Sequence, residues 1–318
     1  MKKRIFAVIF IIVALAAGFY FSREAAGETK KKQYLFGATY MTMNNPYFPA
    51  LNESIKEVIE GNGDILITRN PLQDQDKQNE QIADMIEEGI DLLFLNPVNL
   101  RGVKPAIKLC QENDIPIIVV DTNVLGEEEQ EIILSIIVSD NYDAGVQCAL
   151  DMMTRRSEAK IVVVNHPEIN STNMRVQGFK DTITDYPSYQ VVDERVVTTE
   201  LVPAMKEMQK VLYTDVEFDV VLGGNDPTAL GCLAAMQMHR VNEDILIYGI
   251  DGSPAGKAMI KAGYLTGTAA QYPTQIGGTA ASTAYSYLEG KPVEKKVIVP
   301  VSLITEKNLR EFDVNGWQ

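Results

Sequence analysis

The stretches DLLFLN (residues 91–96) and PIIVVD (residues 116–121) share one pattern, in which four apolar residues in a row are followed by a single polar residue. Apolar runs this short and continuous are typical of strands that are buried on both faces of a parallel sheet. Parallel strands need a long crossover between them, which a helix usually supplies. The two stretches therefore predict an α/β fold.

The same pattern recurs from residue 34 onward, and helix-like segments such as 49–61, 76–89 and 227–240 separate the apolar runs. The strand candidates are residues 34–40, 64–69, 91–96, 116–121, 135–140, 160–165, 189–197, 218–226, 244–251 and 264–271. About ten such units are too many for one ordinary open sheet, so we predict two doubly wound parallel-sheet lobes. A (β/α)₈ barrel has a similar period and is the structural alternative.

Polar side chains stand at the ends of several predicted strands. They are Asn96, Asp121, Asn225, Asp251 and Gln271. One such residue alone is typical of a turn. Because the carboxyl ends of parallel strands meet at one edge of a sheet, where ligands bind, we expect these five side chains to converge on one cleft. Carboxylates accept hydrogen bonds and amides both donate and accept, which suits a ligand covered in hydroxyl groups.

The segment MNNPYF (43–48) follows the first strand candidate and has two interpretations. In the first, Asn45 caps a helix, Pro46 takes its first position, and the aromatic rings of Tyr47 and Phe48 enter the core. In the second, the two rings form a flat apolar wall for the C–H face of a sugar. The converging strand ends favour the second interpretation.

Composition excludes several classes of protein. The chain has 318 residues, of which 46% are apolar, and its net charge of −14 argues against nucleic acid as a partner. Its three cysteines, Cys110, Cys148 and Cys232, are far apart in helix-like stretches. We interpret them as buried small hydrophobic residues and not as a disulfide frame or a zinc site.

Residues 1–33 are predicted to form a signal peptide or a signal anchor followed by a linker. MKKR precedes the uncharged apolar run 5–21, which is at the lower limit for spanning a bilayer. The run has no clean A-x-A cleavage site after it and no nearby cysteine that could carry a lipid. These features favour an uncleaved N-terminal apolar helix that contacts the membrane.

From about residue 34 to 318 the chain resembles the periplasmic sugar-binding proteins of the ribose/galactose type, which share a fold with the ligand domains of LacI-type repressors. The segments that carry the resemblance are NNPYF (44–48), KQNEQI (77–82), LFLNP (93–97), PIIVVD (116–121), SDN (139–141), RVQGF (175–179), GGNDPTALG (223–231), GIDGSP (249–254) and AAQYPTQIG (269–277). The resemblance implies a type I periplasmic binding protein with a three-crossing hinge. It also implies an N-terminal lobe of 34–139 and 272–300, and a C-terminal lobe of 140–271 and 301–318.

The resemblance implies a set of sugar-contacting residues that contains the five strand-end residues. The set is Asn45, Tyr47, Phe48, Asn96, Asp121, Arg175, Asn225, Asp251 and Gln271. Thr122 joins this set, but ribose binders carry a second arginine there. Near Thr199, where ribose binders place another aromatic residue, this chain has none. The identity of the pentose or hexose is therefore left open.

The sequence lacks the common nucleotide-binding and hydrolase motifs. It has no P-loop, no G-x-G-x-x-G fingerprint after a strand and no G-x-S-x-G elbow. His166 and His239 have no local metal-ligand spacing, although His166 follows a strand candidate that could face the cleft. Glycosidase carboxylates in a barrel are an alternative for the strand-end acids, but nothing picks out an acid–base pair. We therefore expect a binding protein without enzymatic activity, cofactor or metal.

Two functions agree with these expectations. The first is an extracytoplasmic protein that closes around a monosaccharide and presents it to an ABC-type sugar permease. The second is a membrane-anchored sugar sensor that signals to a histidine kinase or another receptor, and the predicted anchor raises this option. A cytoplasmic repressor comes third, because residues 1–33 do not resemble a DNA-binding helix-turn-helix.

Overall fold

The computed structural model describes residues 32–124, 126–241 and 244–318, and Leu35–Gln318 form one compact unit with two six-stranded sheets. The strands of the first sheet are, in sheet order, β11 (Lys296–Val299), β5 (Ser135–Ser139), β4 (Ile117–Val120), β3 (Leu92–Leu95), β1 (Leu35–Thr39) and β2 (Ile65–Arg69). The strands of the second sheet are β12 (Ser302–Thr305), β10 (Gly267–Ala270), β9 (Leu246–Asp251), β8 (Val220–Gly223), β6 (Ala159–Asn165) and β7 (Tyr189–Val196). We call each sheet with its helices the first and the second lobe.

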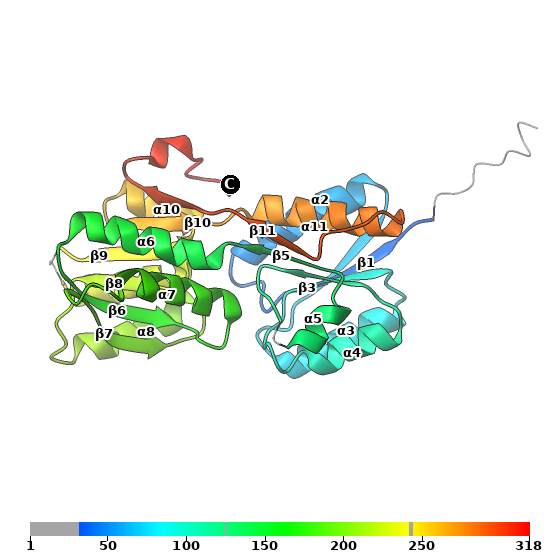
Figure 1. The fold of residues 1–318 in the computed structure, drawn as a ribbon, viewed down its shortest axis with the longest axis horizontal. Helices are drawn as coiled ribbons and strands as arrows, with labels where there is room; N and C mark the ends of the chain where they lie inside the picture. The colour runs from blue at the N-terminus through cyan, green and yellow to red at the C-terminus, as the bar shows by residue number, and fades with distance from the viewer. Residues whose placement is uncertain (1–31, 125, 242–243) are drawn as a thin grey trace, which may run out of the picture. The chain divides into compact units, whose positions relative to one another are not determined.

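Every neighbouring pair of strands is parallel except β10 and β12, which are antiparallel. Two open sheets with helices on both faces (Figure 1) confirm the predicted pair of doubly wound lobes and rule out a single closed barrel for the described residues. The apolar run 5–21 lies outside the described residues. Within the part of the chain that the structure describes, none of the helices has the length and hydrophobicity needed to cross a bilayer.

Helices cover both sheets. Those of the first lobe are α2 (Tyr47–Gly61), α3 (Gln75–Glu87), α4 (Lys104–Glu112), α5 (Glu127–Ile132) and α11 (Pro273–Leu288). Those of the second lobe are α6 (Asn141–Arg155), α7 (Asn170–Ile183), α8 (Leu201–Leu212), α9 (Asp226–Met238) and α10 (Pro254–Lys261), with a 3₁₀ turn at Leu309–Glu311. Although α2 and α11 are far apart in sequence, they pack side by side on the first sheet (Figure 1).

All ten predicted strands are present, and β11 and β12 are two strands that we did not predict from the sequence. They flank Pro300, which has no backbone N–H and interrupts the run VIVPVSLIT (297–305). β11 pairs with β5 in the first sheet and β12 pairs with β10 in the second. The chain therefore passes from one sheet to the other within this run.

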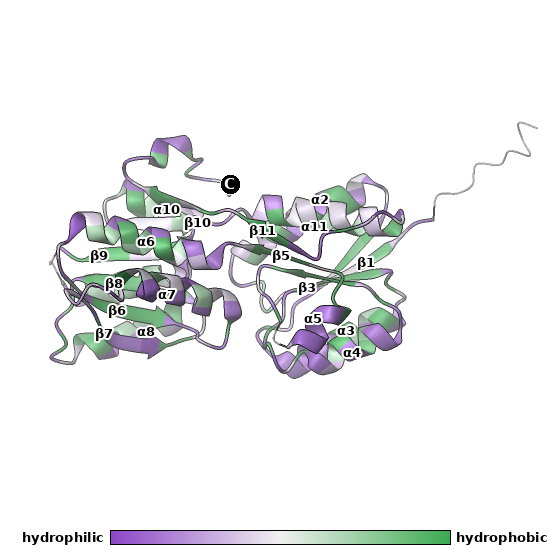
Figure 2. Ribbon diagram, viewed as in Figure 1, coloured by the Kyte–Doolittle hydropathy of each residue, from purple (hydrophilic) through white to green (hydrophobic). Residues whose placement is uncertain are grey.

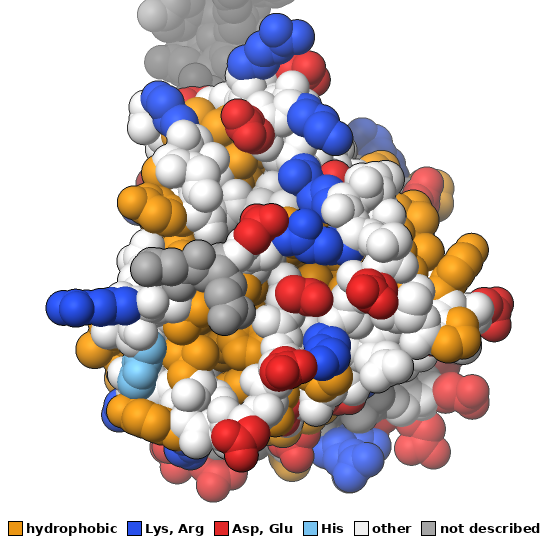
Figure 3. All heavy atoms as spheres, turned by 90° about the vertical axis from the view of Figure 1, so that its left-hand side faces the viewer, with side chains coloured by type: hydrophobic (Ala, Val, Ile, Leu, Met, Phe, Trp, Pro, Cys, Tyr) orange, Lys and Arg blue, Asp and Glu red, His pale blue; other side chains and the backbone are white. Residues whose placement is uncertain are grey.

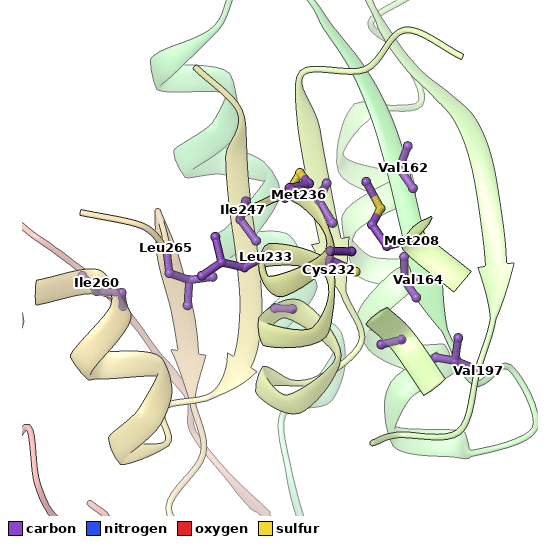
Figure 4. Close-up of a cluster of buried hydrophobic side chains, with 14 of the residues drawn as sticks. Val162, Val164, Val197, Met208, Cys232, Leu233, Met236, Ile247, Ile260 and Leu265 are labelled. Carbon is purple, nitrogen blue, oxygen red and sulfur yellow. The ribbon is translucent and has the colours of Figure 1, made fainter. Parts of the chain in front are cut away.

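The core forms where the apolar strands meet one face of each helix. Figure 2 shows hydrophobic residues concentrated in the strands and hydrophilic residues spread along the helices. In the second lobe, Cys232, Leu233 and Met236 of α9 pack between Ile247 of β9 and Val162 of β6 (Figure 4). Buried apolar area of this kind stabilises the fold by about 25 cal/mol per Å².

The cysteines belong to this packing. Among the described residues, Cys110, Cys148 and Cys232 are free thiols, and all three are buried. Each lies in a helix and belongs to an apolar cluster. This confirms that they serve as small hydrophobic side chains.

Two glycines bring α6 and α7 into close contact. A Cβ on Gly145 of α6 would lie 1.8 Å from the carbonyl oxygen of Arg175, and a Cβ on Gly178 of α7 would lie 2.1 Å from that of Tyr142. Only glycine allows backbones to approach this closely. The contact sets Arg175 on α7 beside Asn141, the first residue of α6.

We predict that Gly178→Ala lowers the free energy of unfolding by about 1–3 kcal/mol, because the added methyl group must push the two helices apart. Urea denaturation measures this change. Gly61→Ala is the matched control, since a Cβ on Gly61 at the end of α2 would meet no atom within 4 Å. The control should be neutral or stabilising by up to about 1 kcal/mol. Equal stability of the two variants would contradict the close contact.

Candidate functional site

The strand ends and loops of both lobes line one narrow cavity. Its lining comprises Met41, Asn45, Tyr47, Phe48, Asp121, Ile169, Ser171, Thr172, Arg175, Thr199, Asn225, Asp251 and Gln271. Eight of the ten residues predicted from the sequence are among them. Asn96 and Thr122 lie outside the lining.

The segment around Asn45 combines features of both sequence interpretations. The Asn45 Oδ1 atom accepts a hydrogen bond from the backbone N–H of Tyr47 at 3.1 Å, and α2 begins at Tyr47. The helix thus starts one residue later than predicted, with Pro46 before its first residue and without a side-chain cap. Tyr47 and Phe48 are both buried, with ring centroids 5.5 Å apart and nearly perpendicular planes, and both line the cavity.

Asp121 follows β4 and is held from behind by Asn96, which follows β3. The Asn96 Nδ2 atom donates to Asp121 Oδ2 at 3.1 Å and to the carbonyl of Val120 at 3.2 Å, while its Oδ1 accepts from the N–H of Met41. Both ends of the Asn96 amide are therefore bonded to protein groups. Asn96 positions Asp121 and is not part of the cavity lining. Burial raises the pKa of Asp121 to about 6, and the Arg175 charge opposes this rise.

Thr122 bonds to the opposite lobe. Its Oγ1 atom accepts from the backbone N–H of Ser171, on α7, at 3.3 Å. A second hydrogen bond between the lobes joins Gln73 Nε2 to Glu200 Oε1 at 2.8 Å. The two lobes therefore contact each other across the cavity.

Arg175 is the cation of the cavity lining and is almost fully buried. Its Nε atom donates to Asn141 Oδ1 at 2.8 Å and its Nη1 to the carbonyl of Gly224 at 2.9 Å. The same Nη1 lies 3.8 Å from Asp251 Oδ1, so the guanidinium and the carboxyl group of Asp251 face each other inside the second lobe. The rigid guanidinium is thus fixed from two sides before any ligand binds.

Asp251 and Gln271 stand side by side at the ends of β9 and β10. The Gln271 Nε2 atom donates to Asp251 Oδ1 at 2.8 Å. Asp251 Oδ2 and Gln271 Oε1 are buried and have no hydrogen-bond partner among the residues that the structure describes. Buried acceptors without a partner are costly and mark a place where a ligand can donate.

The backbone at both cavity acids is unusual. The φ angle is +67° at Asp121 and +150° at Asp251. Residues other than glycine adopt such angles rarely and at a cost of about 1–3 kcal/mol, and they do so most often at functional sites. Both residues with this backbone conformation are acids of the cavity lining.

A third acid, Asp226, lies behind Asp251 and was not singled out by the sequence. It is fully buried and accepts hydrogen bonds from Ser253 N–H (2.8 Å), Ser253 Oγ (2.7 Å) and Thr268 Oγ1 (2.6 Å). Burial, followed by the charge of Asp226, raises the pKa of Asp251 to about 8. Asp226 thus ties α9 to the two strands that carry Asp251 and Gln271.

Asn225 lines the cavity but caps α9 as well. Its Oδ1 accepts from Thr228 N–H (3.0 Å) and Thr228 Oγ1 (2.6 Å), and its Nδ2 donates to the carbonyl of Thr199 (3.0 Å). The lining residues that the sequence missed are Met41, Ile169, Ser171, Thr172 and Thr199. They belong to loops or to the first turn of α7, and none of them is a charged or amide side chain at the end of an apolar run.

His166 and Trp317 differ in their relation to the cavity. His166 lies outside the lining, its carbonyl accepts from Thr172 Oγ1, and burial lowers the pKa of its imidazole. Trp317 also lies outside the lining, but its ring centroid lies 5.8 Å from that of the lining residue Tyr47 in an edge-to-face contact.

The outer surface of the second lobe carries mixed charges. Figure 3 shows acidic and basic side chains interspersed over the end of this lobe, without a continuous block of Lys and Arg on that face. A nucleic-acid-binding surface needs a concentrated basic patch. In the cavity, by contrast, two carboxyl groups, one guanidinium, amides and an aromatic pair converge.

Comparison with known proteins agrees with this geometry. The sequence model of the family described as periplasmic binding protein domain matches residues 36–292. The ribose import binding protein of Bacillus subtilis (strain 168) is 29% identical over 279 residues, which are 87% of this chain and 89% of that protein.

Solved structures share the fold. The periplasmic binding protein component of the arabinose ABC transporter from Shewanella sp. ANA-3 has a TM-score of 0.82 and 22% identity, with 87% of this chain and 93% of that chain covered. The fructose-binding periplasmic domain of a hybrid two-component system has a TM-score of 0.81 and 24% identity, with 88% and 93% covered.

We predict that the unfolding free energy of Asp251→Asn increases relative to that of the parent protein as the pH rises. The raised pKa means that the folded protein keeps a proton on Asp251 between about pH 4 and pH 8, where the unfolded chain has lost it. Unfolding then releases a proton, so the parent protein loses stability as the pH rises through this window, and the variant does not. From pH 5 to pH 8 the unfolding free energy of the variant should gain about 2–4 kcal/mol on the parent.

Chemical denaturation at several pH values measures this difference. Asp185→Asn, at an exposed position between α7 and β7, is the control and should follow the parent at every pH. A pH-independent difference between Asp251→Asn and the parent would show that Asp251 is ionised throughout the window.

Proposed function

The chain belongs to the periplasmic binding protein domain family, a family of binding proteins and not of enzymes, and from that premise we propose that it binds one monosaccharide outside the cytoplasm. The observation that carries the proposal is the pair of buried, unpartnered polar atoms Asp251 Oδ2 and Gln271 Oε1 in the cavity lining. Hydroxyl groups of a sugar both donate and accept hydrogen bonds, so neighbouring hydroxyls can satisfy Gln271 Oε1 and either protonation state of Asp251.

The other lining residues have complementary roles in this proposal. Arg175 donates to ring or hydroxyl oxygens, and Asp121 accepts from hydroxyls on the side of the first lobe. Tyr47 and Phe48 cover the C–H face of the ring. Asn45 and Asn225 complete the polar rim around the sugar.

Closure of the two lobes is the proposed conformational change. We keep the boundaries 34–139 with 272–300 and 140–271 with 301–318, and the membership of β11 and β12 in different sheets supports them. A ligand that contacts both lobes stabilises the closed arrangement relative to an open one. The three connections near residues 139–141, 271–273 and 300 then act as the hinge.

Delivery of the sugar to an ABC-type permease is the first candidate for the biological output, and the ribose and arabinose importers among the related proteins support it. Thr122, which replaces the second arginine of ribose binders, leaves the sugar itself open. A calorimetric panel of D-ribose, D-xylose, L-arabinose, D-galactose, D-fructose and myo-inositol tests the proposal. Heat of binding for at least one of these compounds is the expected result.

We predict that Asp251→Ala and Arg175→Ala weaken binding of the best ligand of this panel. A hydrogen bond to a charged group contributes about 1.5–3 kcal/mol, so loss of one such bond costs about 10- to 150-fold in affinity. Asp251→Ala removes two acceptors and should approach a thousandfold. Isothermal titration calorimetry on the folded variants measures the change.

Asp185→Ala is the control for this experiment, because residue 185 is exposed and lies outside the cavity lining. It should bind with the affinity of the parent. Folded Asp251→Ala and Arg175→Ala proteins that bind within threefold of the parent would refute the proposed site.

A membrane-anchored sugar sensor is the second candidate. It is favoured by the apolar run 5–21 and by the structural similarity to a sugar-binding domain of a hybrid two-component system. In this alternative the closed protein stays at the membrane and contacts a receptor such as a histidine kinase.

We predict that residues 5–21 remain on the native protein, because the run is long enough to span a bilayer and lacks a good cleavage site. Mass spectrometry of the protein extracted from membranes should find peptides from this segment. A mature N-terminus between residues 17 and 30 would refute the anchor and weaken the sensor alternative.

A further inference from the structure

The tail segment, residues 313–318, reaches the cavity wall of the first lobe. The edge-to-face contact between Trp317 and Tyr47 has an interplanar angle of 81°. Tyr47 is buried and lines the cavity, so Trp317 supports this wall from outside. Edge-to-face aromatic pairs fix the orientation of both rings.

The tail segment also binds the two strand ends that carry the unpartnered acceptors. The side-chain amide nitrogen of Gln318 lies within hydrogen-bond distance of three carbonyl oxygens, those of Asp251 (3.2 Å), Gly252 (3.2 Å) and Gln271 (2.7 Å). One amide group therefore bridges the ends of β9 and β10. The backbones of Asp251 and Gln271 are also joined directly, because the Gln271 N–H donates to the Asp251 carbonyl at 3.0 Å, and the bridge reinforces this pairing.

A buried lysine holds the tail segment in place. Lys257 of α10 is fully buried, and its Nζ atom donates to the carbonyl of Gly316 at 2.7 Å and to Gln318 Oε1 at 2.9 Å. A buried ammonium group without such acceptors is very costly. The turn after β9 packs closely against the tail segment, because a Cβ on Gly252 (φ +68°) would lie 2.4 Å from Gln318 Nε2.

The tail segment is bonded to the first lobe too. Thr274 of α11 donates from its Oγ1 atom to the backbone carbonyl of Gln318 at 2.8 Å. Together with the Trp317–Tyr47 contact, this gives the tail two attachments to the first lobe and several to the second.

From these contacts we infer that residues 313–318 are a positioning element of the binding site: Gln318 reinforces the pairing of the strand ends that carry Asp251 and Gln271, and Trp317 supports Tyr47. The expected effect of this element on ligand affinity rests on the proposed sugar-binding function. Preorganised polar groups bind more tightly because they lose less freedom when the ligand arrives. Loss of the bridge lets both strand ends relax without removing any group that touches the ligand.

The first test needs no ligand. Hydrogen–deuterium exchange of full-length Gln318→Ala is compared with that of Asn315→Ala, an exposed residue of the same segment. Peptides that cover 249–256 and 268–275 should exchange at least about threefold faster in Gln318→Ala, while the rest of the chain and the melting temperature stay unchanged. Identical exchange in the two variants overturns the positioning role.

The second test uses the best-binding compound of the panel of D-ribose, D-xylose, L-arabinose, D-galactose, D-fructose and myo-inositol. Gln318→Ala and Trp317→Ala should each bind it about 5- to 30-fold more weakly than the parent, whereas Trp317→Phe and Asn315→Ala should bind within threefold. Trp317 is the single tryptophan of the sequence, so its fluorescence should change with the same affinity that calorimetry reports.

The outcomes separate the two proposals. Weaker binding of Gln318→Ala together with a ligand-dependent tryptophan signal supports the inference. Affinity of Gln318→Ala and Trp317→Ala within twofold of Asn315→Ala, with tryptophan emission unchanged at saturation, overturns it and leaves the sugar-binding function intact. If no compound of the panel binds the parent, the proposed function fails, and the exchange experiment alone decides the positioning role.

Discussion

The constraint on which the rest of the structure depends is the burial of the Arg175 guanidinium beside the Asp251 carboxyl group at the edge of the second sheet. Removing a charge from water costs several kcal/mol, and this cost is offset only when hydrogen bonds hold the charged group in good geometry. The close packing of α6 on α7 aligns Asn141 with the guanidinium, and Gln271 bonds the carboxyl group of Asp251. The local fold of this lobe is thus arranged around one buried cation and the acid beside it.

The cavity region holds more buried acids than cations, and burying these acids costs stability. Asp121 and Asp251 share one cation, and Asp226 adds a third buried acid behind them. Burial therefore raises the pKa of each acid, and the free protein relieves the excess charge by holding a proton. A ligand whose hydroxyl groups hydrogen-bond to these carboxyl groups reduces the same cost, because Asp251 Oδ2 has no partner among the described residues.

The sequence was sufficient to predict the groups that stand at strand ends and insufficient for those on loops. Asp121 and Asp251 are predictable because an apolar run must stop at the sheet edge, and the edge of a parallel sheet is where ligands bind. Ser171 and Thr172 reach the cavity only because α7 begins there, a tertiary fact that no local pattern encodes. Asn96 shows the opposite case, since its position was predicted but its amide is used by neighbouring groups that only the packed structure reveals.

Thr122 contacts the other lobe at a position where the resemblance to ribose binders implies a ligand-binding arginine. An arginine at this position would offer a charged hydrogen bond of about 1.5–3 kcal/mol to a sugar, whereas the threonine accepts a neutral bond of about 0.5–1.5 kcal/mol from Ser171 of the other lobe. The charged contact would be formed only with ligand present, but the neutral one needs no ligand. In the proposed closing motion the Thr122–Ser171 bond would therefore favour closure without a ligand, and Arg175 would be the cation that a ligand meets in the lining.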